Sequence, residues 1–250
     1  MKNKILEISH LTKNYQDLSG ETLAVKDVSF DVYEKEFLAI VGPSGCGKST
    51  ILSILSDLEE KSAGTIRFNK ENIVLGYMLQ KDSLFPWRTI LDNCLLGLEI
   101  TNSLTEESRE YVVSLLQTYG LAEFMDKYPS SLSGGMRQRA ALIRTLAIKP
   151  DILLLDEALS ALDYQTRLAL SDDLYHIIKS EGKTAIMITH DLAEAISMAD
   201  RIIVLTKRPS VVKKIYEVKM KNKSTPIHNR KCREFSEYYD QIWRDLDVHI

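Results

Sequence analysis

An α/β fold with a mostly parallel central sheet is predicted by three features of the 250-residue chain. Residues 36–42, EFLAIVG, form a continuous apolar run, as expected of a strand that is buried on both faces of a sheet. After Pro150, strand-like and helix-like segments alternate, which favours parallel strands with helices packed on their faces. From Pro86 to Pro150 the segments are all helix-like, so we expect this stretch to be a helical insertion into the α/β core.

The other elements follow from local patterns along the chain. Thr105 before Glu106 favours a helix start, and Gly120 favours its stop. Asp191 with Glu194 three residues later predicts a capping box at the start of another helix. Strands are expected at residues 4–11, 23–32, 64–68, 73–80, 151–157, 184–190 and 201–205, and helices at residues 48–58, 89–100, 105–120, 134–148, 168–178, from 191 onward, and 233–246.

Composition sets the broad class. Hydrophobic residues are 44% and charged residues 27%, which is ordinary for a globular protein, and a net charge of −3 gives no sign of a nucleic-acid surface. The three cysteines share no metal-like spacing. No apolar run approaches the roughly 20 residues of a membrane span. We therefore expect no nucleic-acid partner, reduced thiols, and a location inside the cell.

A glycine-rich loop between the first buried strand and a helix predicts a phosphate site. Its sequence, GPSGCGKST, matches the pattern G-x-x-x-x-G-K-[ST]. The glycines let backbone N–H groups turn toward phosphates, Lys48 reaches the β- and γ-phosphates, and the Ser49 hydroxyl is an Mg²⁺ ligand. We expect Cys46 to be a small filler in the loop. The loop residues expected to bind a nucleoside triphosphate are Gly42, Pro43, Ser44, Gly45, Cys46, Gly47, Lys48, Ser49 and Thr50.

Two carboxylates follow the apolar run ILLL. Ligand sites in open α/β sheets lie at the carboxyl ends of strands, which is where Asp156 and Glu157 stand. Asp156 is expected to hold Mg²⁺, directly or through water. Glu157 is free to act on an attacking water.

A second helix start also suits an anion. The stretch SLSGGMRQRAALIRTLA, residues 131–147, places two glycines after a serine at the start of a long helix that contains three arginines. Its position far along the chain makes it difficult to share one phosphate cluster with the glycine-rich loop.

Taken together, these motifs resemble the nucleotide-binding subunit of ABC transporters. LSGGM at residues 132–136 is similar to the family's signature motif, and SALD at 160–163 is similar to its D-loop. The resemblance covers about residues 5–205 and implies a P-loop NTPase with an N-terminal antiparallel β subdomain and an inserted α-helical subdomain. It further identifies Tyr15 as the aromatic residue that stacks on adenine, Gln80 as the Q-loop glutamine, and His190 as the switch histidine.

The resemblance also implies the composition of the active site. Two copies would form a dimer with two ATP molecules sandwiched between them, and Ser133, Gly134 and Gly135 of one copy would cover the γ-phosphate held by the other. Lys48, Glu157 and His190 would be catalytic, Gln80 would sense Mg²⁺ or water, and Asp163 would cross the interface. ATP and Mg²⁺ are the implied cofactors, and Ser49, Gln80 and Asp156 the implied metal-binding residues.

A finer resemblance concerns residues 82–100, DSLFPWRTILDNCLLGLEI. This segment and the C-terminal residues 233–246 are similar to the ATPases of the nitrate, sulfonate and taurine importers. Ala158 departs from the family, which usually has proline after the glutamate, and leaves the substrate assignment open. Membrane permease subunits are the implied partners, with a substrate-binding protein as an indirect one, and the implied location is peripheral, on the cytoplasmic face of the membrane.

The resemblance divides a single ATP-binding domain, residues 1–250, into three parts. These are an α/β core with the β subdomain at 1–84 and 151–206, a helical subdomain at 85–150, and a C-terminal strand and helix at 207–250. The compact middle segment argues against ABC ATPases of DNA repair, and the single cassette argues against ABC translation factors. A single-cassette ATPase of iron–sulfur cluster assembly remains the alternative.

Overall fold

The central element of this computed structural model is a six-stranded sheet in the order β5–β6–β7–β3–β8–β9. The structure describes residues 3–17, 20–160 and 162–246. All neighbouring strands pair in parallel except β9, which pairs antiparallel with β8. The strands of this sheet are β3 (Phe37–Val41), β5 (Leu75–Met78), β6 (Ile152–Asp156), β7 (Thr184–Ile188), β8 (Arg201–Leu205) and β9 (Val212–Glu217).

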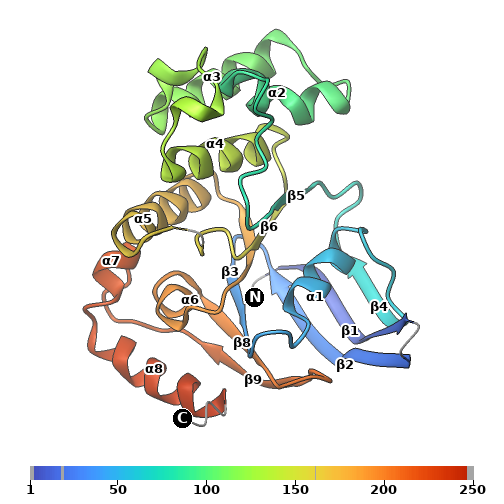
Figure 1. Cartoon of the computed structure of the whole chain (residues 1–250). Coiled ribbons are helices and arrows are strands. Elements are labelled where there is room, and N and C mark those ends of the chain that lie inside the picture. Colours follow the sequence, from blue (N-terminus) through green and yellow to red (C-terminus); the bar gives the residue numbers. More distant parts are fainter. Residues whose placement is uncertain (1–2, 18–19, 161, 247–250) are drawn as a thin grey trace.

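A separate three-stranded antiparallel sheet, in the order β2–β1–β4, flanks the core sheet (Figure 1). Its strands are β1 (Lys4–Asp17), β2 (Gly20–Tyr33) and β4 (Ala63–Phe68). The two sheets together confirm the predicted fold class, including its antiparallel N-terminal part.

Helices cover the core sheet and extend beyond it. In Figure 1, α2, α3 and α4 lie together above the sheet, whereas α5, α6 and α8 lie along one side of it. The helices are α1 (Lys48–Leu55), α2 (Ile90–Ile100), α3 (Glu106–Thr118), α4 (Gly134–Ala147), α5 (Tyr164–Ser180), α6 (Leu192–Met198), α7 (Pro226–Asn229) and α8 (Arg233–Asp245), with 3₁₀ turns at Ala122–Phe124 and Pro129–Ser131.

Alternation along the buried strands builds two cores on opposite faces of the sheet. Successive strand side chains point to opposite faces, so Leu38 and Ile40 of β3 join a cluster with α1 and the antiparallel sheet. Phe37, Ala39 and Val41 join the cluster on the other face, which includes residues of α4, α5 and α6. The continuous apolar run at 37–41 is therefore explained by burial on both faces.

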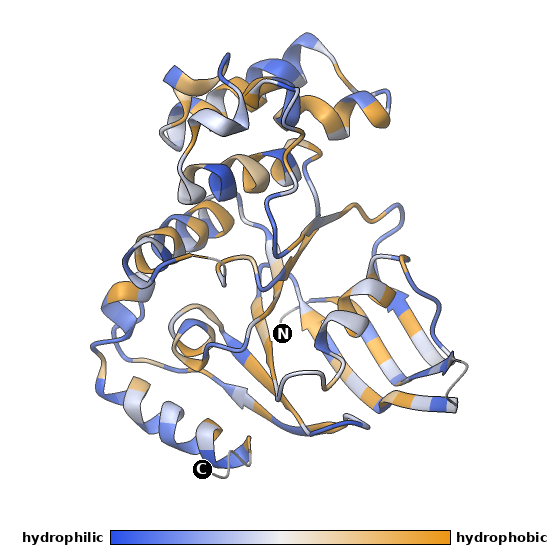
Figure 2. Cartoon of the chain, in the orientation of Figure 1, coloured by the Kyte–Doolittle hydropathy of each residue, from blue (hydrophilic) through white to orange (hydrophobic). Residues whose placement is uncertain are grey.

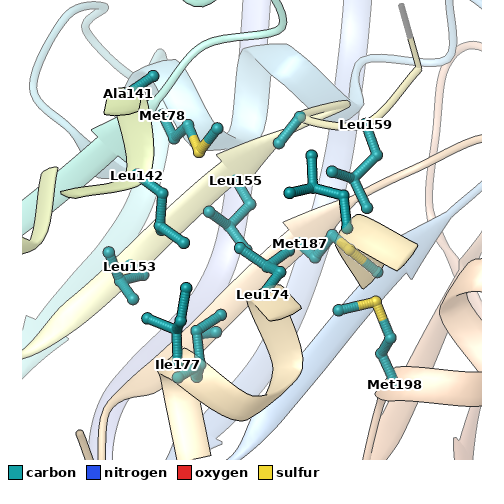
Figure 3. Packing of buried hydrophobic residues seen from close by; sticks show 14 of the residues in the cluster. Met78, Ala141, Leu142, Leu153, Leu155, Leu159, Leu174, Ile177, Met187 and Met198 are labelled. Carbon is teal, nitrogen blue, oxygen red and sulfur yellow. The ribbon is translucent and has the colours of Figure 1, made fainter. Parts of the chain in front are cut away.

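The face covered by α5 is packed by medium-sized aliphatic and methionine side chains. Figure 3 shows Leu174 and Ile177 of α5 beside Leu153 and Leu155 of β6, with Met187 of β7 close by. Figure 2 shows hydrophobic residues concentrated in the central strands, whereas hydrophilic residues dominate α8. The strand ends are thus held by dense packing on both sides of the sheet.

The expected helix ends are found with one correction. Thr105 caps α3 and accepts from Ser108 N, and Gly120 with φ 74° follows its last turn. Asp191 caps α6 by accepting from Ala193 N and Glu194 N. The predicted capping box is wrong in its second half, because the Asp191 N–H donates to Thr189 Oγ1 (3.0 Å), whereas the Glu194 side chain is buried.

The C-terminal segments agree with the sequence pattern. Ile242 of α8 is fully buried, and Phe235, Tyr238 and Tyr239 pack against the main core. Tyr238 Oη donates to the Glu217 carbonyl of β9 (2.8 Å), which fixes α8 against the edge strand. Among the residues that the structure describes, no helix is long and apolar enough to span a bilayer.

Candidate nucleotide-binding site

The loop between β3 and α1 has a backbone that only glycine accommodates easily. Gly47 precedes α1 with φ 106°, a conformation that other residues rarely adopt. A Cβ atom at Gly47 would also lie 3.0 Å from Val25 Cγ2 and 3.3 Å from the Ala24 carbonyl oxygen. The chain therefore turns sharply here and starts α1 with its N–H groups facing the loop.

Lys48 is held inside this loop. Its side chain is almost completely buried, and Nζ donates to the carbonyl oxygens of Gly42 (2.8 Å) and Pro43 (3.1 Å). Cys46 is 1% exposed, and burial raises the pKa of its thiol despite the nearby Lys48. The structure thus agrees with a filler role for Cys46, because a buried thiol of raised pKa is a poor nucleophile.

The carboxyl end of β6 meets the start of α1. Ser49 Oγ donates to Asp156 Oδ1 (3.0 Å), and Tyr77 Oη donates to Asp156 Oδ2 (3.1 Å). Burial raises the pKa of Asp156, while the two hydrogen bonds oppose the rise. The hydroxyl and carboxylate oxygens are hard ligands of the kind that Mg²⁺ prefers, and a magnesium ion needs few protein ligands beside phosphate and water. These two residues fit the predicted metal site.

Glu157 lies at the centre of a small polar network. Its φ is 47°, and its N–H donates to the Ile188 carbonyl at the end of β7 (2.9 Å). The Oε2 atom lies 3.2 Å from His190 Nδ1 and accepts from Gln80 Nε2 (3.4 Å), which also donates to Ser160 Oγ (3.0 Å). A left-handed conformation at a non-glycine residue is uncommon and concentrates at functional positions.

One cavity of about 290 Å³ joins several of the predicted residues. Tyr15 lines it, and Tyr15 Oη also contacts Thr50 Oγ1 (3.2 Å) and donates to Glu59. The lining residues are Tyr15, Ala24, Ser44, Gly45, Gly47, Lys48, Ser49, Thr50, Glu157 and Arg208. The structure therefore brings the aromatic residue, the phosphate loop and the carboxylate into one space.

The signature segment, residues 132–136, does not line the cavity of the phosphate loop. Ser133 caps α4 and accepts from Met136 N (3.4 Å), and Asp163 caps α5 and accepts from Thr166 N (3.1 Å). Gly134 lines a second cavity of about 340 Å³ that shares no lining residue with the first. Ala161 of the D-loop lies outside the described residues. Within one chain, this segment is not part of the phosphate-loop cavity.

The arginines of α4 have internal partners. Arg137 pairs with Asp82 (3.0 Å), Arg139 pairs with Asp173 (2.7 Å), and Arg144 donates to the carbonyls of Asp82 (2.7 Å) and Ser83 (2.8 Å). Within this chain the three arginines thus have structural partners, and the anion-binding role of the helix start stays a prediction. Arg137 and Arg144 connect α4 to the segment that follows Gln80, and Arg139 connects α4 to α5.

Sequence reasoning missed Gln138, which connects the same two elements. Its side chain is 4% exposed, and Nε2 donates to the Gln80 carbonyl (3.1 Å). A buried amide with a backbone partner is a positioning group, but nothing in a single sequence marks it. Only its place one turn after the two glycines could have drawn attention to it.

The fold and this site define a P-loop nucleoside triphosphatase. A family model described as ABC transporter matches residues 25–160, and the chain belongs to this family. It is thus an ABC-type ATPase, as the motifs predict.

Similar proteins agree with this assignment. YtlC of Bacillus subtilis, an ABC transporter ATP-binding protein, is 43% identical over 248 residues, 97% of this chain and 95% of its own length. The nitrate import ATP-binding protein NrtD of Synechocystis sp. is 34% identical over 247 residues, 95% of this chain and 93% of NrtD. The dimeric post-hydrolysis structure of the ATP-binding cassette MJ0796 with ADP and Pi is 30% identical, with a TM-score of 0.73 over 86% of this chain and 99% of that one.

A buried carboxyl close to the site gives a pH-dependent stability. Glu194 of α6 is 4% exposed, and burial raises its pKa from 4.5 to about 7, with Asp191 adding to the rise and Thr189, Arg167 and Arg230 opposing it. The folded chain therefore keeps this proton up to a higher pH than the unfolded chain. Wild-type stability should fall as the pH rises from 4.5 to 7, because only the unfolded state gains from ionisation there.

We expect Glu194→Gln to remove this loss. One pKa unit corresponds to about 1.36 kcal/mol, so the free energy of unfolding of the variant should gain roughly 3 kcal/mol on the wild type between pH 4.5 and pH 8. Urea denaturation across this range measures the difference. Glu123→Gln, at an exposed position, is the control and should show no such trend. If the difference in free energy of unfolding between Glu194→Gln and the wild type stays constant with pH, the raised pKa of Glu194 is contradicted.

Proposed function

We propose that this chain is the ATP-binding and ATP-hydrolysing subunit of an ABC importer for nitrate, sulfonate, taurine or related small organic solutes. The observation that carries the proposal is the contact of Glu157 with His190 and Gln80 beside the phosphate loop. Each of these residues comes from a different strand end, and together they form the arrangement that γ-phosphate hydrolysis needs.

The phosphate end of ATP binds at the loop and the start of α1. Backbone N–H groups and the Lys48 ammonium stabilise charge that develops on the transferred phosphoryl group. Ser49 and Asp156 would hold Mg²⁺, which when bound neutralises charge on the β- and γ-phosphate oxygens. Tyr15, which lines the same cavity, would offer its ring to the base.

Glu157 is the general base. Water attacks the γ-phosphorus, its proton passes to Glu157, and the bond to the oxygen bridging the β- and γ-phosphorus atoms breaks to release ADP and phosphate. His190 and Gln80 both contact Oε2 of this carboxylate, so its orientation depends on both. Such positioning of a base contributes ~10²–10⁴ in rate.

The second cavity gives a reason for a dimer. Gly134, at the start of α4, lines a cavity that shares no lining residue with the phosphate-loop cavity of the same chain, which favours a role of this segment toward a second copy. In a head-to-tail dimer each signature segment covers the γ-phosphate held by the partner. The ATP-binding cassette MJ0796, to which this chain is similar, is dimeric in its post-hydrolysis state with ADP and Pi, which supports a dimer here.

The segment after Gln80 is suited to contact a membrane permease. Trp87 is 70% exposed, and its ring centroid lies 5.0 Å from that of Phe85. The fully buried Asn93 fixes the segment, since it accepts from Phe85 N (2.7 Å) and donates to the carbonyls of Phe85, Arg88 and Thr89. A rigid loop that displays an exposed tryptophan is typical of a protein-binding surface.

This surface is coupled to the chemistry through a few contacts. Arg137 and Arg144 of α4 hold residues 82 and 83, and Gln138 holds the Gln80 carbonyl. A permease that moves this surface would therefore move Gln80 relative to Glu157. The chain would act at the cytoplasmic face of the membrane as a peripheral subunit, with a substrate-binding protein serving the same permease. The resemblance of residues 82–100 and the likeness to NrtD support the proposed solute class.

Glu157→Gln should retain ATP binding and lose turnover. The amide preserves the size of the side chain but cannot accept the proton, so we expect phosphate release to fall by ~10²–10⁴. Equilibrium ATP binding and steady-state phosphate release measure the two properties. Glu110→Gln, at an exposed position of α3, should behave as the wild type. Near-normal phosphate release by Glu157→Gln would rule out its role as base.

Ser133→Arg tests the composite site. In the Glu157→Gln background we expect ATP to produce a dimer in light scattering, because hydrolysis no longer opens it. Adding Ser133→Arg should abolish this dimer while each chain still binds ATP, since the bulky cation is then at the interface and not in the phosphate-loop cavity. Ser114→Arg, at an exposed position of α3, is the matched control. An unchanged ATP-dependent dimer in the Ser133→Arg chain would contradict the proposal.

Trp87→Ala tests the permease surface. We expect basal ATPase activity to remain within about twofold of the wild type, and co-purification with membrane subunits to fall at least about tenfold, as for a central interface aromatic. Leu58→Ala removes another exposed apolar side chain, 66% exposed near the end of α1, and should not affect the complex. Equal recovery of the permease with Trp87→Ala and wild type would show that the surface has another use.

A further inference from the structure

The loop between β8 and β9 is fixed against the phosphate loop and β2. Thr206 N donates to the Val211 carbonyl (3.1 Å), and Val211 N donates to Thr206 Oγ1 (3.0 Å), which closes the turn. Ser210 is fully buried, with its N–H on the Ala24 carbonyl (3.0 Å) and its own carbonyl accepting from Lys26 N (2.9 Å). The residues between these anchors have a defined position.

Arg208 stands in this turn and reaches the nucleotide cavity. Its Nε donates to the Gly45 carbonyl (3.3 Å), and its side chain lines the cavity beside Ser44, Lys48 and Ser49. A terminal guanidinium nitrogen is 3.6 Å from where a Cβ atom on Gly45 would be. The cation is therefore placed next to the loop whose N–H groups receive the phosphates.

The positive charge of Arg208 is not paired with an acidic side chain of the described residues. Within residues 3–17, 20–160 and 162–246, Arg208 forms no ion pair, and its one hydrogen bond engages only Nε. The guanidinium carries five N–H donors in a planar fork that matches phosphate geometry. Four donors on the wall of a phosphate-binding cavity thus remain for a ligand. An arginine meant only to support the loop would not need this position at the cavity wall.

We propose that Arg208 is a nucleotide-binding residue that donates to the phosphate chain of ATP and ADP from the cavity wall beside Gly45. The inference rests on the proposed nucleotide site and adds a ligand that none of the loop motifs contains. Removal of one hydrogen bond to a charged group should weaken binding by roughly ten- to hundredfold.

The test compares four chains: wild type, Arg208→Ala, Arg208→Lys and Lys207→Ala. Lys207 is the neighbouring exposed cation, so its removal changes the net charge by the same amount. Dissociation constants are measured for ATP, ADP and 2′-deoxyATP, together with the melting temperature of each nucleotide-free chain. We expect Arg208→Ala to lose roughly ten- to hundredfold in affinity for all three nucleotides, Arg208→Lys to lose less because it keeps the charge without the planar fork, and Lys207→Ala to match the wild type.

Three results would overturn the inference. If Arg208→Ala binds ATP within about twofold of the wild type, the proposed contact does not exist. If Arg208→Ala and Arg208→Lys lose equal affinity for nucleotide and both have lowered melting temperatures, Arg208 only stabilises the loop. A loss with ATP that is absent with 2′-deoxyATP would move the contact to the ribose. If the wild type and Lys207→Ala also bind no nucleotide, it is the proposed function that fails.

Discussion

The parallel register of the core sheet is the constraint on which the site depends. Ile188 at the end of β7 is level with Ile40 of β3 and with Asp156 of β6, and Val41 is level with Val204 of β8. Parallel strands end at the same edge of a sheet. The phosphate loop, the two carboxylates, His190 and the Arg208 turn therefore all follow strands that end at this edge. A shift of one residue in any of these pairings would turn the side chains of that strand to the opposite face.

The sequence was sufficient for the local parts of this design. Apolar runs predicted the buried strands, and the spacing of glycine, lysine and serine predicted the phosphate loop next to β3. It was not sufficient for contacts set by strand order. Gln80, Glu157 and His190 follow β5, β6 and β7, and they meet because these strands are neighbours in the sheet. No local pattern encodes that order, so only family resemblance could group the three residues.

Other residues could not be predicted because their roles depend on tertiary partners. Arg144 and Gln138 appear in the sequence as ordinary helix residues, yet they bond the backbone of residues 80–83. Arg208 lies in a segment rich in lysine and arginine, and no local pattern there distinguishes it as a residue of the nucleotide site. Glu194 occupies the N3 position of α6 and suits a capping box, but its side chain is buried in the fold and does not complete the box. In each case tertiary packing overrides the local preference.

The burial of two cysteines has a practical consequence for labelling. Cys46 in the phosphate loop is 1% exposed, and Cys94 of α2 is fully buried with its pKa raised to about 12. Cys232, at the start of α8, is the partly exposed member of the three. Thiol reagents react through the accessible thiolate, so a maleimide dye would attach at the C-terminal helix. The native chain thus offers an attachment point for a fluorophore or spin label remote from the phosphate loop, without cysteine substitutions.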